Sequence, residues 1–133
     1  MGEPAAVQLI SPQQSMVCVV VGDWQRRQFL IDSLTGLGCE VAAFQDIASA
    51  NAADIAENCV LITAEHLPDG YFDELTQKLA QNRKALPTIV TAVDGDINSA
   101  VSAFQHGAID YLTEPYSSFD ICNTVKRAIR KHY

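Results

Sequence analysis

Short apolar runs alternate along this chain with segments in which apolar residues recur at helical spacing. Each run is apolar at nearly every position, and several are rich in valine and isoleucine, which is typical of strands covered on both faces of a sheet. We therefore expect five buried strands, at residues 16–21, 39–44, 59–63, 86–93 and 108–112.

The segments between these runs predict five helices. Their expected positions are residues 24–37, 47–55 and 71–80, a fourth helix between 97 and 107, and a last helix after residue 117. Asp96 is placed to cap the fourth helix, and Ser117 with Asp120 has the pattern of a capping box at the last one. The fourth helix has apolar residues at i, i+3, i+4 and i+7, which are Ile97, Ala100, Val101 and Phe104.

This alternation, with short loops, predicts an α/β fold, doubly wound and flavodoxin-like, with a five-stranded parallel sheet in the order 2-1-3-4-5. Residues 16–133 are expected to form this domain and residues 1–15 a flexible leader. Ligands of such sheets bind outside the carboxyl ends of the strands. The residues that follow each strand are therefore the candidates for function.

Composition narrows the range of partners. The chain has 133 residues and carries 9 basic against 16 acidic residues, for a net charge of -7. This charge disfavours direct binding to nucleic acid or to an anionic membrane, and no segment approaches the roughly 20 apolar residues that span a bilayer. The four cysteines are far apart and form no zinc pattern, so we expect reduced core residues in a cytoplasmic protein, with no cofactor and no metal.

From about residue 16 to residue 131 the chain resembles the receiver domains of bacterial response regulators, which act in two-component signal transduction. The likeness is carried by residues 96–101 and 104–112, and by Pro68 with Gly70 in the loop after the third strand. The resemblance implies the flavodoxin-like fold and a role in signal transduction or transcription regulation. It also implies a set of pocket positions that can be compared one by one.

A working receiver binds a phosphoryl group. In the family, two acidic residues after the first strand and an aspartate at the tip of the third strand hold Mg²⁺, while a Thr or Ser after the fourth strand and a Lys before a Pro grip the phosphoryl group. The concentrated negative charge of a phosphoryl group is stabilised when a metal ion, a hydroxyl and an ammonium group surround it. The matching positions here, with one neighbouring acid, form a degenerate phosphorylation pocket: Val21, Gly22, Asp23, Thr63, Ala92 and Glu114.

Each matched position departs from the family pattern. Val21 and Gly22 stand for the acidic pair, Ala92 for the hydroxyl residue, and Glu114 inverts the charge of the lysine. The acceptor position is Thr63, whose hydroxyl cannot form an acyl phosphate. A shifted register does not restore the acceptor, because no aspartate lies between residues 59 and 68. The resemblance therefore implies a pseudo-receiver that works independently of phosphorylation.

Receivers commonly dimerise or bind partners through the face formed by the fourth helix, the fifth strand and the fifth helix. The resemblance implies that this interaction face contains Ser99, Ser102, Gln105, Tyr111, Thr113, Asn123 and Arg127. A DNA-binding output domain outside this chain, as in many relatives, is a further expected partner. We predict a dimer or protein-binding module and no enzyme, since no phosphate loop, nucleophile elbow or metal-ligand set is present.

Two alternatives stay open for the pocket. The chain is alternatively a sensor that binds a small ligand in the vacated space between Gly22, Thr63, Ala92 and Glu114. A less favoured possibility is a cation held by carboxylates that converge there, from Asp23, Glu65 and Glu114.

Tyr111 allows two interpretations. In the family this position holds an aromatic side chain that swings, and the absence of a hydroxyl at Ala92 then predicts that Tyr111 keeps one position. The simpler interpretation is a half-buried tyrosine at a strand end, with its hydroxyl in water.

Overall fold

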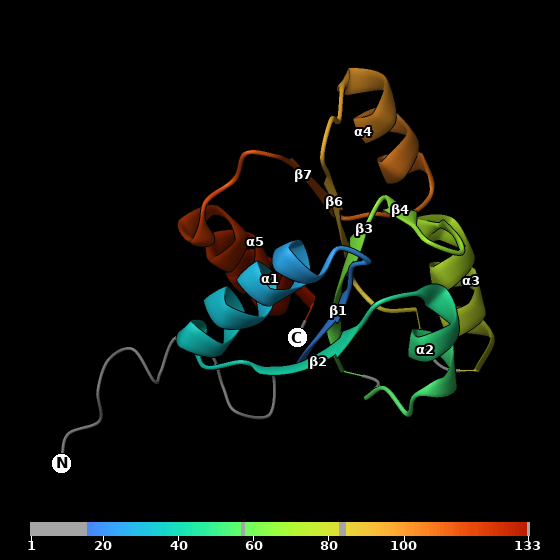
Figure 1. Ribbon diagram of the computed structural model, residues 1–133, viewed down its shortest axis with the longest axis horizontal. Helices are drawn as coiled ribbons and strands as arrows, with labels where there is room; N and C mark the ends of the chain where they lie inside the picture. The colour runs from blue at the N-terminus through green and yellow to red at the C-terminus, as the bar shows by residue number, and fades with distance from the viewer. Residues whose placement is uncertain (1–15, 57, 83–84, 133) are drawn as a thin grey trace, which may run out of the picture.

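The structure of the chain is a computed structural model that describes residues 16–56, 58–82 and 85–132. Its centre is a five-stranded parallel sheet in the order β2-β1-β3-β6-β7 (Figure 1). The strands are β1 (Met16–Val20), β2 (Glu40–Phe44), β3 (Val60–Ala64), β6 (Thr88–Ala92) and β7 (Asp110–Thr113). Counted along the chain, this order is 2-1-3-4-5, which confirms the predicted fold class. The predicted leader at 1–15 lies outside the described residues.

Helices cover both faces of this sheet (Figure 1). α1 and α5 pack on one face, while α2, α3 and α4 lie on the other. Their bounds are α1 (Trp24–Leu37), α2 (Ile47–Ala52), α3 (Phe72–Asn82), α4 (Ile97–Gln105) and α5 (Ser118–His132). None of the helices in the described part of the chain is long and apolar enough to cross a membrane.

The sheet is apolar on both faces, as the unbroken apolar runs predict. Alternate residues of β1 point to opposite sides, so that Val17 and Val19 join the cluster under α1 and α5, whereas Cys18 and Val20 join the cluster under α2 and α3. All four side chains are fully buried. The first strand is therefore central to both halves of the core.

A short hairpin, which the sequence pattern did not predict, connects β3 to α3. It pairs β4 (His66–Leu67) with β5 (Gly70–Tyr71) in antiparallel fashion. Between the two strands, the Asp69 carboxylate accepts hydrogen bonds from the backbone N–H groups of Ile47 at 2.9 Å and Ala48 at 3.1 Å. The hairpin thus satisfies the orphan donors at the start of α2.

The predicted caps are present in the structure. The Asp96 carboxylate accepts a hydrogen bond from the Ser99 N–H at 2.8 Å at the start of α4. Before α5, the Ser117 N–H donates to the Asp120 carboxylate at 2.9 Å, and the Asp120 N–H donates to the Ser117 hydroxyl at 3.0 Å, which is a complete capping box. Gly107, with φ 98°, takes the left-handed conformation after α4.

The apolar stripe of α4 is not a core face. Ile97, Val101 and Phe104 are 81%, 49% and 48% exposed. Of the α4 residues, all of which the structure describes, Ala103 alone is buried. The helical spacing predicted the helix correctly, but periodicity alone does not tell which face of a helix meets the sheet. In α4 the face with the small residue Ala103 packs on the sheet.

Candidate functional site

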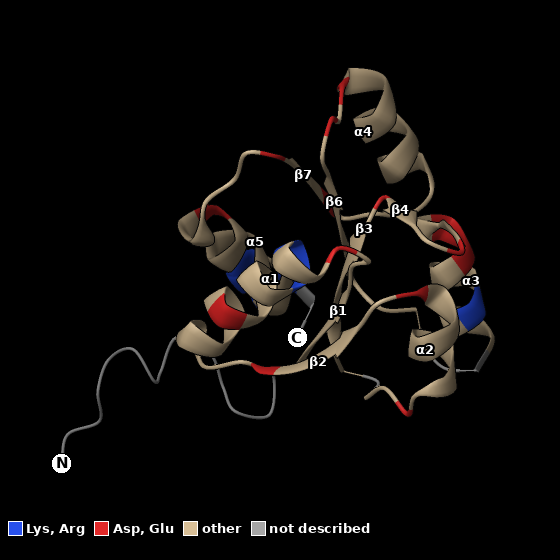
Figure 2. Ribbon diagram, viewed as in Figure 1, with Lys and Arg blue, Asp and Glu red and all other residues tan. Residues whose placement is uncertain are grey.

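The loops that follow β1, β3, β6 and β7 meet at the carboxyl edge of the sheet, where this fold places its ligands. The first hollow at this edge, the β3–β6 hollow, has a volume of about 290 Å³ and is lined by Ala64, Glu65, His66, Thr91, Ala92, Val93, Asp94 and Ser99. The second, the α1–β7 hollow, has about 340 Å³ and is lined by Asp23, Gln25, Arg26, Phe29, Glu114, Pro115 and Tyr116. Figure 2 shows acidic segments around this edge, at the start of α4 and between β7 and α5.

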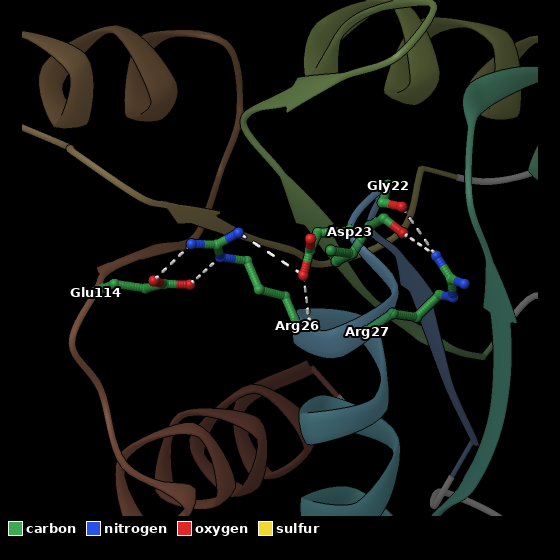
Figure 3. A network of polar contacts seen from close by, with 6 residues as sticks. Gly22, Asp23, Arg26, Arg27 and Glu114 are labelled. Carbon is green, nitrogen blue, oxygen red and sulfur yellow. Dashed lines mark hydrogen bonds and ion pairs between the residues drawn. The ribbon is translucent and has the colours of Figure 1, made fainter.

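An ion network lies across the α1–β7 hollow (Figure 3). The Arg26 guanidinium donates to both oxygens of Glu114, from Nε at 2.6 Å and from Nη2 at 3.3 Å. Its Nη1 lies 3.7 Å from Asp23 Oδ2. The hydrogen bond and the charge of Glu114 raise the pKa of Arg26 above its ordinary value, so the guanidinium stays charged. Glu114, at the position matched to the family's lysine, is therefore neutralised by a cation from α1.

Asp23 takes part in this network and also caps α1. Its Oδ2 accepts a hydrogen bond from the Arg26 backbone N–H at 2.9 Å, in the geometry of an N-cap. The Glu114–Pro115 peptide bond that follows β7 is cis. Both acidic residues of the hollow are thus paired with groups of the chain itself.

The space around Gly22 is closed on two sides. Arg27 Nη1 donates to the carbonyl oxygens of Val21 at 2.7 Å and Gly22 at 3.2 Å (Figure 3). A Cβ added at Gly22 would lie 3.0 Å from two ring carbons of Pro68, a distance that real Cβ contacts rarely reach. A side chain at position 22 therefore requires the Pro68 ring, in the turn of the hairpin, to give by a few tenths of an ångström.

The structure shifts the expected register by one residue at the end of β1. Val21 is 3% exposed and belongs to the cluster under α1 and α5, so it cannot face a ligand at the edge. The two residues that follow at the edge are Gly22 and Asp23. One acidic residue therefore remains of the expected pair, and it caps α1.

The same shift applies at the end of β3. Thr63 is fully buried, and its hydroxyl donates to the carbonyl oxygen of Ala64 at 3.0 Å. Ala64, the last residue of β3, lines the β3–β6 hollow together with Ala92 at the end of β6. Ala64 therefore lies at the edge of the hollow beside Ala92, whereas Thr63 does not. Thr63 is a structural residue of the sheet.

The vacated space that the ligand alternative needs is divided. Ala92 lines the β3–β6 hollow, Glu114 lines the α1–β7 hollow, and Thr63 lies inside the sheet. The cation alternative requires Asp23, Glu65 and Glu114 to lie together. Glu65 lines the β3–β6 hollow, however, whereas Asp23 and Glu114 line the α1–β7 hollow. No group of three or more metal-binding side chains occurs among the residues that the structure describes.

Glu65 contributes a polar cluster that the sequence did not reveal. The residue is 7% exposed, and its carboxylate accepts hydrogen bonds from the hydroxyls of Tyr71 at 3.2 Å and Tyr111 at 3.3 Å. Burial, and next the Glu65 charge, raise the pKa of Tyr111, while burial chiefly raises the pKa of Tyr71. Tyr111 therefore holds a position with its hydroxyl on a buried carboxylate instead of in water. The signal in the sequence was a lone acid directly after a buried strand.

The predicted interaction face lies over α4, β7 and α5. Its residues Ser99, Ser102 and Asn123 are half-buried, whereas Gln105, Thr113 and Arg127 are exposed. The Arg127 guanidinium donates to the Asp110 carboxylate at 3.1 Å, and the Thr113 hydroxyl accepts a hydrogen bond from the Gly95 N–H at 3.0 Å. The exposed apolar side chains Ile97, Val101 and Phe104 of α4 were not among the predicted contact residues.

Known proteins resemble this chain in sequence and in structure. The DNA-binding transcriptional regulator NtrC of Escherichia coli (strain K12) is 32% identical over 127 residues, which cover 91% of this chain and 26% of NtrC. The transcriptional regulatory protein FixJ of Rhizobium meliloti (strain 1021) is 33% identical over 104 residues, or 77% of this chain and 50% of FixJ. The chain thus spans about a quarter of NtrC and half of FixJ. No protein-family model matches the chain.

Among solved structures, the crystal structure of FixJ-N superposes with a TM-score of 0.78 at 30% sequence identity. The superposition covers 89% of this chain and 94% of FixJ-N, so the likeness extends over nearly a whole domain. The fold and the sequence identity agree with one another. The chain belongs to the receiver domains of response regulators, a family of non-enzymatic signalling modules.

Proposed function

We propose that this receiver domain signals without being phosphorylated, and that it acts in transcription regulation through protein contacts or self-association. The observation that carries the proposal is the Arg26–Glu114 ion pair. A phosphoryl group needs a free cation at this edge, but the chain offers a carboxylate there, and that carboxylate already holds the nearby guanidinium. An incoming phosphoryl group would meet a negative charge.

The remaining pocket positions support the same proposal. Ala64 has no carboxylate to accept a phosphoryl group, and Ala92 has no hydroxyl to bind one. Gly22 has no side chain to supply a second carboxylate, and Asp23 is engaged as a helix cap. Mg²⁺ takes hard oxygen ligands in octahedral geometry, which a single engaged carboxylate does not provide.

The proposed contact surface is the α4–β7–α5 face, centred on the exposed stripe of Ile97, Val101 and Phe104. Three large apolar side chains on one helix face are costly to leave in water, which favours a partner. The beryllofluoride-activated NtrC4 receiver domain, which has the same fold with a TM-score of 0.77, forms a dimer. We propose that the stripe takes part in self-association here as well.

DNA binding is assigned to a part of the protein other than this domain. NtrC is named a DNA-binding regulator, and the chain matches only about a quarter of it. The net charge of -7 argues against contact between this domain and DNA. We propose that the domain passes its signal to an output domain of that kind, in the cytoplasm.

The test is an amide NMR titration with Mg²⁺ and then beryllofluoride, with the NtrC4 receiver as the positive control. We expect the control to show saturable shifts, and this chain to show none at Gly22, Ala64, Ala92 and Glu114. Saturable shifts at these four positions would show that the pocket still binds a phosphoryl mimic, and the proposal would be wrong.

The contact surface needs a separate experiment. Sedimentation over a concentration series should show self-association that V101D abolishes, because a charge on the stripe cannot be buried without a partner. W24D is the matched control, since Trp24 is 65% exposed on α1, away from α4. Equal behaviour of the two variants would rule out the stripe as the self-association surface.

A small-ligand sensor is the second candidate, and the β3–β6 hollow is the observation that favours it. Its volume of about 290 Å³ suits a small molecule, and its acidic lining residues Glu65 and Asp94 favour an organic amine. A saturable rise in melting temperature with amines, lost in D94N, would support this function. Flat melting curves would exclude it for this class of ligand.

A further inference from the structure

One buried carboxylate joins three parts of the chain at the β3–β6 hollow. Glu65 follows β3, Tyr71 belongs to the hairpin, and Tyr111 belongs to β7. Each carboxylate oxygen accepts one tyrosine hydroxyl, Oε2 from Tyr71 and Oε1 from Tyr111. The Glu65 backbone is fixed as well, because its N–H donates to the Thr91 carbonyl at 2.8 Å. The carboxylate is therefore a fixed point on the sheet.

Tyr111 connects this fixed point to the loop before α4. A Cβ built on Gly95 would lie 2.3 Å from the Tyr111 hydroxyl oxygen, so the phenol ring lies directly against the backbone at residue 95. On the same loop, the Gly95 N–H donates to the Thr113 hydroxyl at 3.0 Å. β7 therefore contacts the loop through two side chains, one of which Glu65 holds in place.

The packing of α4 itself contributes little to its position. Ala103 is its buried residue, and it contacts a small cluster that includes Phe72, Val90 and Ala108. One buried methyl group contributes about as much stability as a single hydrogen bond. The polar contacts at the start of α4 therefore weigh as much as its apolar packing.

We propose that Glu65 is a positioning residue, which sets the place of α4 by holding Tyr111 against the loop at Gly95. The carboxylate is part of the chain, so the arrangement is present without any phosphoryl group. Its meaning for signalling rests on the proposed function, in which the α4 stripe is the contact surface. The geometric link between Glu65 and α4 does not depend on that function and is tested separately.

The first test compares two tyrosine variants that each remove one hydroxyl from the same carboxylate. Y111F breaks the bond that leads to α4, and amide hydrogen exchange in residues 99–105 should become about tenfold faster, as expected for the loss of a hydrogen bond to a charged group. Y71F breaks the bond to the hairpin but keeps the ring that packs against the Ala103 cluster and His106, so it should accelerate exchange in α4 less than Y111F does. Unchanged exchange in α1 and α5 shows that both variants are folded.

Two results would overturn the inference. One is exchange in α4 of Y111F within twofold of the unmodified chain, and the other is an equal acceleration in Y111F and Y71F. A double-mutant cycle adds a second measurement, because E65A and Y111F remove the same link and E65A/Y111F should accelerate exchange no more than E65A alone. Multiplicative acceleration in the double variant would mean that Glu65 and Tyr111 act on α4 independently.

The two proposals fail in different ways. The exchange experiment is run at a concentration where the chain is monomeric, so it reports on the Glu65–Tyr111 link even if the stripe binds no partner. Faster exchange in α4 of Y111F, together with no self-association of the unmodified chain, would contradict the contact surface alone. Self-association with unchanged exchange in Y111F would contradict the positioning role alone.

Discussion

Helix α4 is held on the sheet in a different way from α1 and α5. α1 and α5 cover a continuous apolar cluster that includes Leu30, Leu34, Ile121 and Val125, all fully buried. α4 rests on Ala103 and exposes its large apolar residues to solvent. Dense packing fixes the first pair of helices, whereas polar contacts at the loop ends hold α4. A small change in those contacts can therefore move α4 without loosening the core.

The largest expected effect contrasts a buried residue of α1 with an exposed residue of α4. L34A removes a fully buried side chain under α1, and it should lower the free energy of unfolding by about 3 kcal/mol. V101A trims a residue that is 49% exposed on α4, and it should change the same quantity by less than about 0.5 kcal/mol. Urea unfolding of both variants measures the difference. Equal losses would mean that the stripe of α4 is part of the core.

The next effect concerns the loop before α4. G95A places a Cβ against the Tyr111 hydroxyl and should cost about 1–3 kcal/mol, because the ring must move. G36A is the matched control, since a Cβ at Gly36, inside α1, meets nothing within 4 Å and should stabilise the helix by about 0.5–1 kcal/mol. Thermal unfolding of the two variants measures the loss of stability expected for G95A and the gain expected for G36A. If G95A were as stable as the unmodified chain, Tyr111 would not pack tightly against this loop.

A smaller effect comes from the Arg26–Glu114 pair, which links α1 to the β7–α5 loop. The side chains are 42% and 30% exposed, so solvent screens them. R26Q, E114Q and the double variant should give a coupling energy of about 0.5–1 kcal/mol, which falls as salt is added. R127Q with D110N is the comparison pair, because Arg127 of α5 and Asp110 of β7 form a second exposed ion pair. A coupling that does not respond to salt would contradict an ionic link.

The smallest effect is a response to acid. The pKa values of Asp69 and Asp96 lie below their ordinary values, chiefly because the backbone N–H groups of Ile47 and Ser99 bond the carboxylates. Such groups stabilise the fold above the unfolded pKa of about 3.9 and lose this contribution as the pH falls below it through the native pKa. α2 and α4 should therefore lose amide protection in acid before α1 and α5. D69N/D96N should be less stable at neutral pH and respond less to acid.

Much of the fold could be predicted from the sequence, because buried strands and helix caps leave local signals. Short apolar runs predicted the ends of the five strands to within two residues, and Asp96, Gly107 and the Ser117–Asp120 box marked helix ends where the structure has them. The β4–β5 hairpin was missed because its strands have two residues each, which is too short for periodicity. The helix predicted at 47–55 ends at Ala52.

The site was harder to predict, because it depends on contacts between residues far apart in the chain. The charge reversal at Glu114 was visible in the sequence, but its partner Arg26 lies 88 positions away. Val21 and Thr63 were assigned to the pocket by a register that burial shifts by one residue. Glu65, directly after β3, became significant only when the structure placed two tyrosine hydroxyls on its carboxylate.

The proline ring beside Gly22 has a consequence for the redesign of this domain. An engineered metal and phosphoryl site would need A64D together with a second carboxylate after β1, as in G22D. A Cβ at residue 22 lies 3.0 Å from two ring carbons of Pro68, so the ring must give by a few tenths of an ångström. A designed site would therefore have to adjust the turn of the hairpin as well as add the two carboxylates.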